Sequence, residues 1–158
     1  MRFPGFMVAL AAPAAELSRS AAEAHGMAKE LPLRAMRDVC WSFTGSPFVT
    51  REEFDASVRH DQIRFRKKDS WRPDAIIIPA LRVAVRYMCW QGDEQVEPVV
   101  TLEADDGVRF PAGELLFKLH NAVVEQLREI DHHFFEGMSL AGWLPGGEVP
   151  RYQLRQGS

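Results

Sequence analysis

Two adjacent histidines, His132 and His133, lie in the stretch REIDHHFFEG, where the sequence comes closest to a catalytic or metal-binding set. A zinc site on a helix uses two histidines four positions apart, which share one helix face. Adjacent helical residues point about 100° apart, so these two imidazoles do not converge on one ion. We therefore expect no bound metal and no hydrolytic role for this pair.

The same stretch has the composition of a helix end. Histidines in a last turn complement the negative end of the helix dipole, and Gly137 suits the left-handed residue that stops a helix. We expect Phe134 and Phe135 to be buried. His120 would lie about 18 Å before the pair along a helix axis. We expect it to be a hydrogen-bonded histidine at the edge of the core.

Other catalytic and cofactor-binding motifs are missing from the sequence. It contains no G-x-S-x-G nucleophile turn, and PGGEVP lacks the Lys-Ser/Thr that a phosphate-binding loop requires. Cys40 and Cys89 each stand beside a tryptophan and lack metal-ligand spacing, so we predict two buried, reduced thiols. A disulfide between them is left open. We expect a protein that is not an enzyme and that binds no cofactor.

The chain has no run near the roughly 18 apolar residues that span a bilayer. Its opening, MRFPGFMVALAAPAAE, imitates a secretion signal, but Pro4 and Gly5 interrupt the apolar run. Together with the thiols, these features favour the cytoplasm, with no membrane partner.

The charge is uneven along the chain, whose formal net charge is −3. Residues 1–92 contain 14 Lys+Arg against 10 Asp+Glu, whereas residues 93–136 contain 3 against 11. Such asymmetry bears on partners rather than on fold. We expect an acidic surface in the second half, partly on an Asp106-Gly107 turn. The residues predicted to bind a basic partner there are Glu103, Asp105, Asp106, Glu125 and Glu129.

The composition, with 46% hydrophobic and 26% charged residues, suits a globular chain. Residues 1–35 are alanine-rich and predict a peripheral helical extension that we expect to be partly mobile. Residues 36–158 predict a single α+β domain. Within it, residues 36–43 favour a strand and residues 137–150 a loop.

The strongest strand pattern covers residues 81–90, in which apolar and polar side chains alternate. A turn after it leads to residues 97–104, so we predict an antiparallel meander. Thr50 and Glu53 have capping-box spacing and predict a short helix over residues 51–60. Residues 61–74 then favour a short exposed strand, and residues 151–155 a last one.

A long helix is predicted over residues 112–131, because apolar residues recur there every three or four positions. We expect it to cover the sheet. The residues expected to be buried on its apolar stripe are Leu116, Leu119, Val123, Leu127 and Phe134.

The region from Met36 to Ser158, with the long helix in FPAGELLFKLHNAVVEQLREIDHHFFEG, resembles the small cytoplasmic immunity proteins of bacterial polymorphic and contact-dependent toxin systems. The likeness is one of general character: compact α+β form, no catalytic motif and an acidic surface. It implies a non-catalytic protein that binds a cognate toxin, such as a nuclease, one to one and occludes it.

Two other functions are compatible with the sequence. One is a small enzyme or ligand-binding domain with a pocket between the sheet and the long helix. The other is a nucleic-acid accessory protein that grips phosphates through residues 64–72, with Phe65 and Trp71 as stacking platforms. Interruption of that run by Asp69 makes nucleic acid the weaker alternative. The oligomeric state is left open.

Overall fold

The computed structural model describes residues 31–158. Most of the predicted helical extension over residues 1–35 therefore lies outside the described residues. Its last five residues are described, and among them Leu31 and Ala35 are buried in the hydrophobic core.

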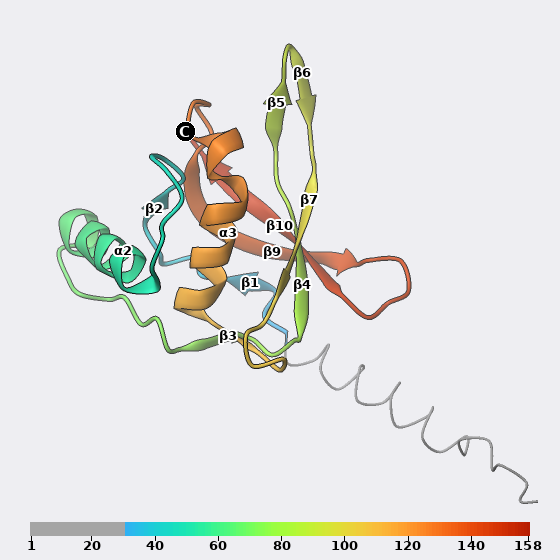
Figure 1. The fold of residues 1–158 in the computed structure, drawn as a ribbon, viewed down its shortest axis with the longest axis horizontal. Coiled ribbons are helices and arrows are strands. Elements are labelled where there is room, and N and C mark those ends of the chain that lie inside the picture. The colour runs from blue at the N-terminus through green and yellow to red at the C-terminus, as the bar shows by residue number, and fades with distance from the viewer. Residues whose placement is uncertain (1–30) are drawn as a thin grey trace, which may run out of the picture. The chain divides into compact units, whose positions relative to one another are not determined.

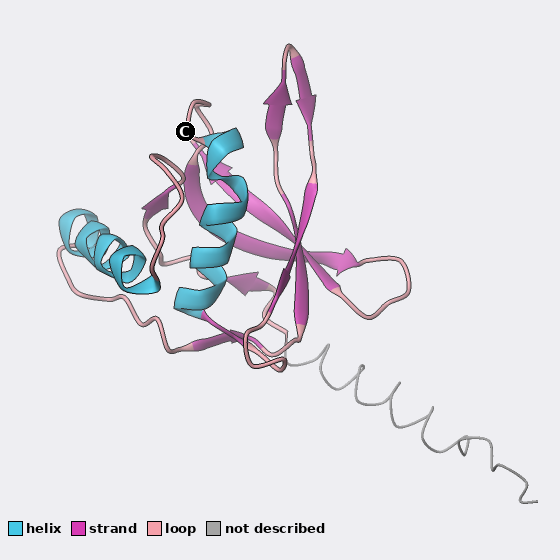
Figure 2. Cartoon of the chain, viewed as in Figure 1, coloured by secondary structure: helices cyan, strands magenta, loops and turns pink. Residues whose placement is uncertain are grey.

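Residues 31–158 form two helices and ten strands (Figures 1 and 2). The helices are α2 (Arg51–Arg66) and α3 (Ala112–Leu127). The strands are β1 (Arg34–Ala35), β2 (Trp41–Ser42), β3 (Ile76–Ile78), β4 (Arg82–Arg86), β5 (Cys89–Gln91), β6 (Glu94–Val96), β7 (Val99–Glu103), β8 (Phe110–Pro111), β9 (Phe134–Trp143) and β10 (Pro150–Gly157).

The main sheet has the strand order β1-β9-β10-β4-β7, with β2 paired to β9 as well. The predicted pairing of residues 81–90 with 97–104 is confirmed, because β4 and β7 are antiparallel with Val85 opposite Val100. A simple antiparallel meander is wrong, however. The last strand, β10, lies between β9 and β4 and runs parallel to β4, so the sheet is mixed.

Helix α3 packs on the core side of this sheet through the predicted stripe. Leu116, Leu119, Val123 and Leu127 are all fully buried, which confirms the helix and its face. The predicted burial of Phe134 is wrong, since this residue is 43% exposed. The helix ends at Leu127 and not at residue 131 as predicted, and Phe134 begins β9, where Phe135 takes the buried position instead.

Helix α2 begins where the capping box predicts, with Thr50 Oγ1 accepting the Glu53 N–H at 3.2 Å. It continues to Arg66, so the predicted end at residue 60 and the exposed strand over residues 61–74 are wrong. Its buried stripe is Phe54, Val58 and Gln62. The third position of this stripe is polar, which hid the helical period from the sequence pattern.

The strand predicted over residues 36–43 is divided into β1 and β2. Met36 has φ 59° and bends the chain between them, and both short strands pair with β9. The loop predicted over residues 137–150 is also wrong in its first half, because β9 extends to Trp143. The histidine pair therefore precedes a strand and does not end the helix.

Gly137 occupies a β-bulge in β9, between the pairs Met138–Leu154 and Phe135–Gln156. Its φ is +86°, a left-handed conformation, and an added Cβ would lie 2.7 Å from the Ala35 carbonyl oxygen. Gly137→Ala should therefore lower the free energy of unfolding by about 1–3 kcal/mol. Denaturant unfolding followed by circular dichroism measures this loss.

The matched control for that substitution is Gly92→Ala. Gly92 also has a positive φ, +62°, but no atom would lie within 4 Å of an added Cβ. It should show only the backbone part of the loss. Equal losses at Gly137 and Gly92 would contradict the close approach of Ala35 to the bulge.

Candidate functional site

The residues predicted to bind a basic partner lie at two ends of α3. The Asp105 N–H donates to Glu114 Oε1 at 2.6 Å, which holds the loop after β7 at the start of the helix. Glu125 lies eleven residues beyond Glu114, about 16 Å along the helix axis, and Glu129 follows the helix end. The structure thus brings Glu103, Asp105 and Asp106 together but places Glu125 and Glu129 apart from them.

All three carboxylates of the loop group are already held in ion pairs, that of Asp106 with Arg109 at 3.6 Å. Asp105 accepts hydrogen bonds from Lys118 at 2.7 Å and from Arg51 at 3.0 Å. The hydrogen bond from Lys118 lowers the pKa of the Asp105 carboxyl below its ordinary value. Glu103 pairs with Arg82 at 2.9 Å. A basic partner would have to compete with these four cations.

Asp106 has a local structural role as well. Its Oδ1 accepts the backbone N–H groups of Val108 at 2.8 Å and Arg109 at 2.9 Å, which closes the turn. The N–H of Arg109, followed by that of Val108, lowers the pKa of this carboxyl. Most of the negative charge of the loop is therefore used within the fold.

The β5–β6 hairpin projects beyond the main sheet, at the end of α3 that carries Glu125 (Figure 1). Trp90 on this hairpin is 49% exposed, whereas its neighbour Cys89 is buried. Asp93 and Glu94, at the turn, are both exposed. The sequence pattern places Trp90 at the end of the strand over residues 81–90 and gives no sign that its indole is exposed.

Gln156 fixes the base of this hairpin. Its Oε1 accepts the Met88 N–H at 2.7 Å, and its Nε2 donates to the Met88 carbonyl at 3.0 Å and to the His132 carbonyl at 2.9 Å. One amide thus joins the hairpin to the segment that follows α3. We call the exposed residues at this end the hairpin surface: Trp90, Asp93, Glu94, Glu125 and Glu129.

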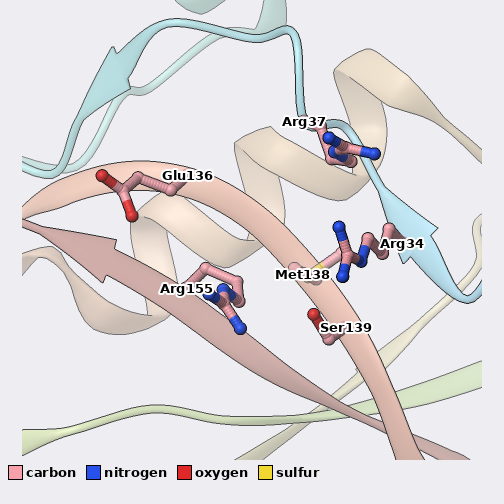
Figure 3. Close-up of a pocket in the computed structure, with 6 residues that line it drawn as sticks. All are labelled: Arg34, Arg37, Glu136, Met138, Ser139 and Arg155. Carbon is pink, nitrogen blue, oxygen red and sulfur yellow. The ribbon is translucent and has the colours of Figure 1, made fainter.

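A second feature is a pocket of 190 Å³ on the sheet (Figure 3). Ala35 and Met138 are buried in the core, so their strand neighbours Arg34 and Ser139 point to the opposite face of the sheet. Three arginines and one carboxylate contribute to the wall. The residues that line the pocket are Arg34, Arg37, Glu136, Met138, Ser139 and Arg155.

The histidines and cysteines do not form a site in the described part of the chain. His120 is fully buried, as a hydrogen-bonded core histidine: Nδ1 accepts the Trp41 indole N–H at 3.2 Å, and Nε2 donates to the Ser46 carbonyl at 3.0 Å. Its burial lowers its pKa. Across residues 31–158, no three His, Cys, Asp or Glu side chains are grouped to hold a metal ion. Cys40 and Cys89 are both free thiols, Cys89 buried and Cys40 half-buried.

The basic run over residues 64–72 does not present two stacking platforms. Trp71 is buried and donates its indole N–H to Asp55 at 3.2 Å. Phe65 is 60% exposed on α2, with Arg64 over its ring at 5.1 Å. A pocket between α3 and the sheet is expected if the chain is a small enzyme or a ligand-binding domain. Side chains of the core fill that space.

Comparison of the chain with protein-family models, curated proteins and solved structures finds no match. Neither α2 nor α3, the helices of the described residues, has the length and apolar character required to cross a membrane.

Proposed function

We propose that this chain is a protein-binding module that docks onto a basic protein through the hairpin surface. The observation that carries the proposal is Trp90, a large apolar side chain held half in solvent on a projecting hairpin. Tryptophan is enriched among the residues that dominate binding energy in protein interfaces. Its exposure here is what a docking residue requires.

The carboxylates of the hairpin turn and of the helix end define the chemistry of the partner. Asp93 lies in the turn of the hairpin and Glu94 directly after it, and Glu125 and Glu129 add carboxylates at and just beyond the end of α3. None of these four takes part in an ion pair among residues 31–158. A partner rich in Lys and Arg would meet carboxylates that are available, and opposite charges speed such an encounter.

The rigidity of the hairpin base supports the same proposal. Since Gln156 holds both backbone groups of Met88, the hairpin is fixed where it leaves the sheet. A surface that is already ordered loses less conformational entropy on binding. In contrast, binding through Asp105 would first break its pairs with Arg51 and Lys118, so we favour the hairpin over that loop.

The partner that we propose is a cognate bacterial toxin with a basic substrate cleft, in line with the resemblance to immunity proteins. The indole would enter an apolar depression, and the carboxylates would pair with the cations that line the cleft. Binding would occlude the cleft without any chemical step. The action proposed is therefore inhibition by contact.

Trp90→Ala tests this proposal. We expect affinity for the partner to fall by at least about 30-fold, which corresponds to roughly 2 kcal/mol for an interface residue of this kind. Asp93→Lys with Glu94→Lys should slow association and reduce its dependence on salt. The partner is first isolated on immobilised wild-type chain. The association and dissociation rates are then measured by surface plasmon resonance with purified components.

Phe65→Ala is the matched control, because Phe65 is also an exposed aromatic residue but lies on α2. It should leave both rates unchanged. A partner that binds the wild type, Trp90→Ala and Phe65→Ala equally well would overturn the proposal. Loss of binding in Phe65→Ala alone would move the docking surface to α2.

A further inference from the structure

We infer that Arg34, Arg37 and Arg155 form a binding site for a small phosphorylated molecule. This site lies on the face of the sheet opposite the buried Ala35 and Met138 and does not depend on the hairpin surface or on the proposed protein partner. Figure 3 shows Arg34 and Arg37 on one side of the pocket and Arg155 on the other, across β9.

Local backbone features bring these residues together. The positive φ of Met36 bends the chain directly after β1, so Arg37 returns toward the pocket that Arg34 enters from the strand. The bulge at Gly137 sets two residues of β9, Gly137 and Glu136, against the single residue Arg155 of β10. Both irregularities interrupt the regular pairing of the sheet at the site of the pocket.

The charges of the pocket are unbalanced. Among residues 31–158, neither Arg34, Arg37 nor Arg155 is in an ion pair. The outward-facing arginines of the neighbouring strand β4 differ in this respect: Arg82 pairs with Glu103 at 2.9 Å and Arg86 with Glu97 at 2.7 Å. Three arginines thus line one pocket without a paired carboxylate, and an anion bound there would be attracted by all three.

The side-chain donors of the pocket favour phosphate as the bound anion. A guanidinium presents a planar fork that matches two oxygens of a phosphate group, and three forks can satisfy a dianion from several sides. The Ser139 hydroxyl, in register with Arg34 on the adjacent strand, adds a further donor. The pocket of 190 Å³ is smaller than the roughly 300–1,000 Å³ of sites for drug-sized ligands. It suits one phosphate with a small substituent.

Glu136 refines the ligand class. Glu136 is the one acidic residue of the lining, and its carboxylate, which lies beside Gly157, accepts hydrogen bonds but repels a bare anion. A ligand with an amine or a hydroxyl group beside its phosphate would satisfy Glu136 and the arginines together. We therefore assign a phosphomonoester that carries a hydrogen-bond donor, with phosphoethanolamine as the test compound.

The experiment is a titration of ¹⁵N-labelled protein, followed by NMR, at constant ionic strength. Phosphoethanolamine should shift the amide signals of Arg34, Ser139 and Arg155 in a saturable manner, whereas chloride should not. Binding should strengthen as the pH rises through the second phosphate pKa of about 6, because the dianion is the species bound. No saturable shift, or an equal response to chloride, would overturn the site.

Variants separate the site from general electrostatic attraction. Arg34→Gln and Arg155→Gln should each weaken phosphoethanolamine binding at least tenfold, while Arg64→Gln on α2 should leave it unchanged. Glu136→Gln should strengthen the binding of inorganic phosphate and reduce the preference for phosphoethanolamine over it. The dispersion of the NMR spectrum shows that each variant is folded. Equal weakening in Arg64→Gln would refute a specific pocket.

A further titration distinguishes a small phosphorylated molecule from a nucleic-acid ligand. A single-stranded oligonucleotide should bind no more tightly per phosphate than inorganic phosphate does. Tight binding of the oligonucleotide, with a steep loss of affinity as salt increases, would overturn the small-molecule assignment.

Discussion

Replacing Leu127 by alanine should lower the free energy of unfolding by about 2–5 kcal/mol. Leu127 is the last residue of α3, and its side chain is fully buried in the core. The substitution removes apolar contacts and leaves a cavity that strands fixed by their hydrogen bonds cannot close. Denaturant unfolding measures the loss, and an unchanged m-value would show that the two-state reading holds.

Leu33→Ala is the control for this prediction, because it removes the same atoms from a side chain that is 75% exposed. Its effect should stay within about 0.5 kcal/mol. A loss at Leu127 no larger than the loss at Leu33 would contradict the packing of the last turn of α3 against the sheet.

The parts of the fold that the sequence predicts are those with a local period. Leu116, Leu119, Val123 and Leu127 lie on one helix stripe, and this spacing is sufficient to predict both α3 and its buried face. The alternation in residues 81–90 likewise predicts β4 and its partner β7. In both cases the period is set by the element itself.

The parts that the sequence does not predict depend on distant partners. Strand β9 is paired by β1, β2 and β10, of which two come about a hundred residues earlier in the chain. Its first residues follow two histidines and include Gly137, which together imitate a helix end. The position of β10 beside β4 is also nonlocal, so no turn signal announces it.

Amide side chains that bond to distant backbone are also not identified by the sequence. Gln62 binds both backbone groups of Cys40, and Asn121 does the same for Phe48. Such amides stabilise loops against the core, yet in the sequence they read as residues that face solvent. The composition of a segment does not distinguish a solvated amide from one that replaces a strand partner.

The candidate sites depend on pairing that net charge does not reveal. Asp105 is paired by Arg51 from 54 positions away, so a negative loop in the sequence is largely neutralised in the fold. Arg34 and Arg155 lie at opposite ends of the described chain and meet at one pocket. A motif search over neighbouring residues cannot detect either arrangement. The acidic balance of residues 93–136 is visible in the sequence, but only the structure distinguishes paired carboxylates from available ones.

Acid should destabilise the fold through His120, as the pH falls below about 6.5, the ordinary pKa of histidine. The ring is enclosed by Trp41, Phe43, Phe48 and Phe54, with centroids 5.2–6.1 Å away. Burial lowers its pKa in the folded state. A proton added to Nδ1 would also face the Trp41 N–H, so two donors would meet where one hydrogen bond exists now.

The sign of the effect follows from the lowered pKa. Because the unfolded chain binds this proton more readily, the contribution of neutral His120 is complete above the unfolded pKa. It decreases as the pH falls toward the folded pKa, by at most about 1.4 kcal/mol per pH unit for one proton. His120→Gln removes the titration while keeping an acceptor for Trp41 and a donor for Ser46. This variant should be less stable at neutral pH, and its stability should fall less between about pH 6.5 and pH 5.

The control is His132→Gln, since His132 is exposed and its only hydrogen bond in the described structure uses its backbone carbonyl. It should retain the pH dependence of the wild type. Denaturant midpoints measured across this range give the three slopes. A His120→Gln slope equal to that of the wild type would show that the proton uptake on acid unfolding belongs to other groups.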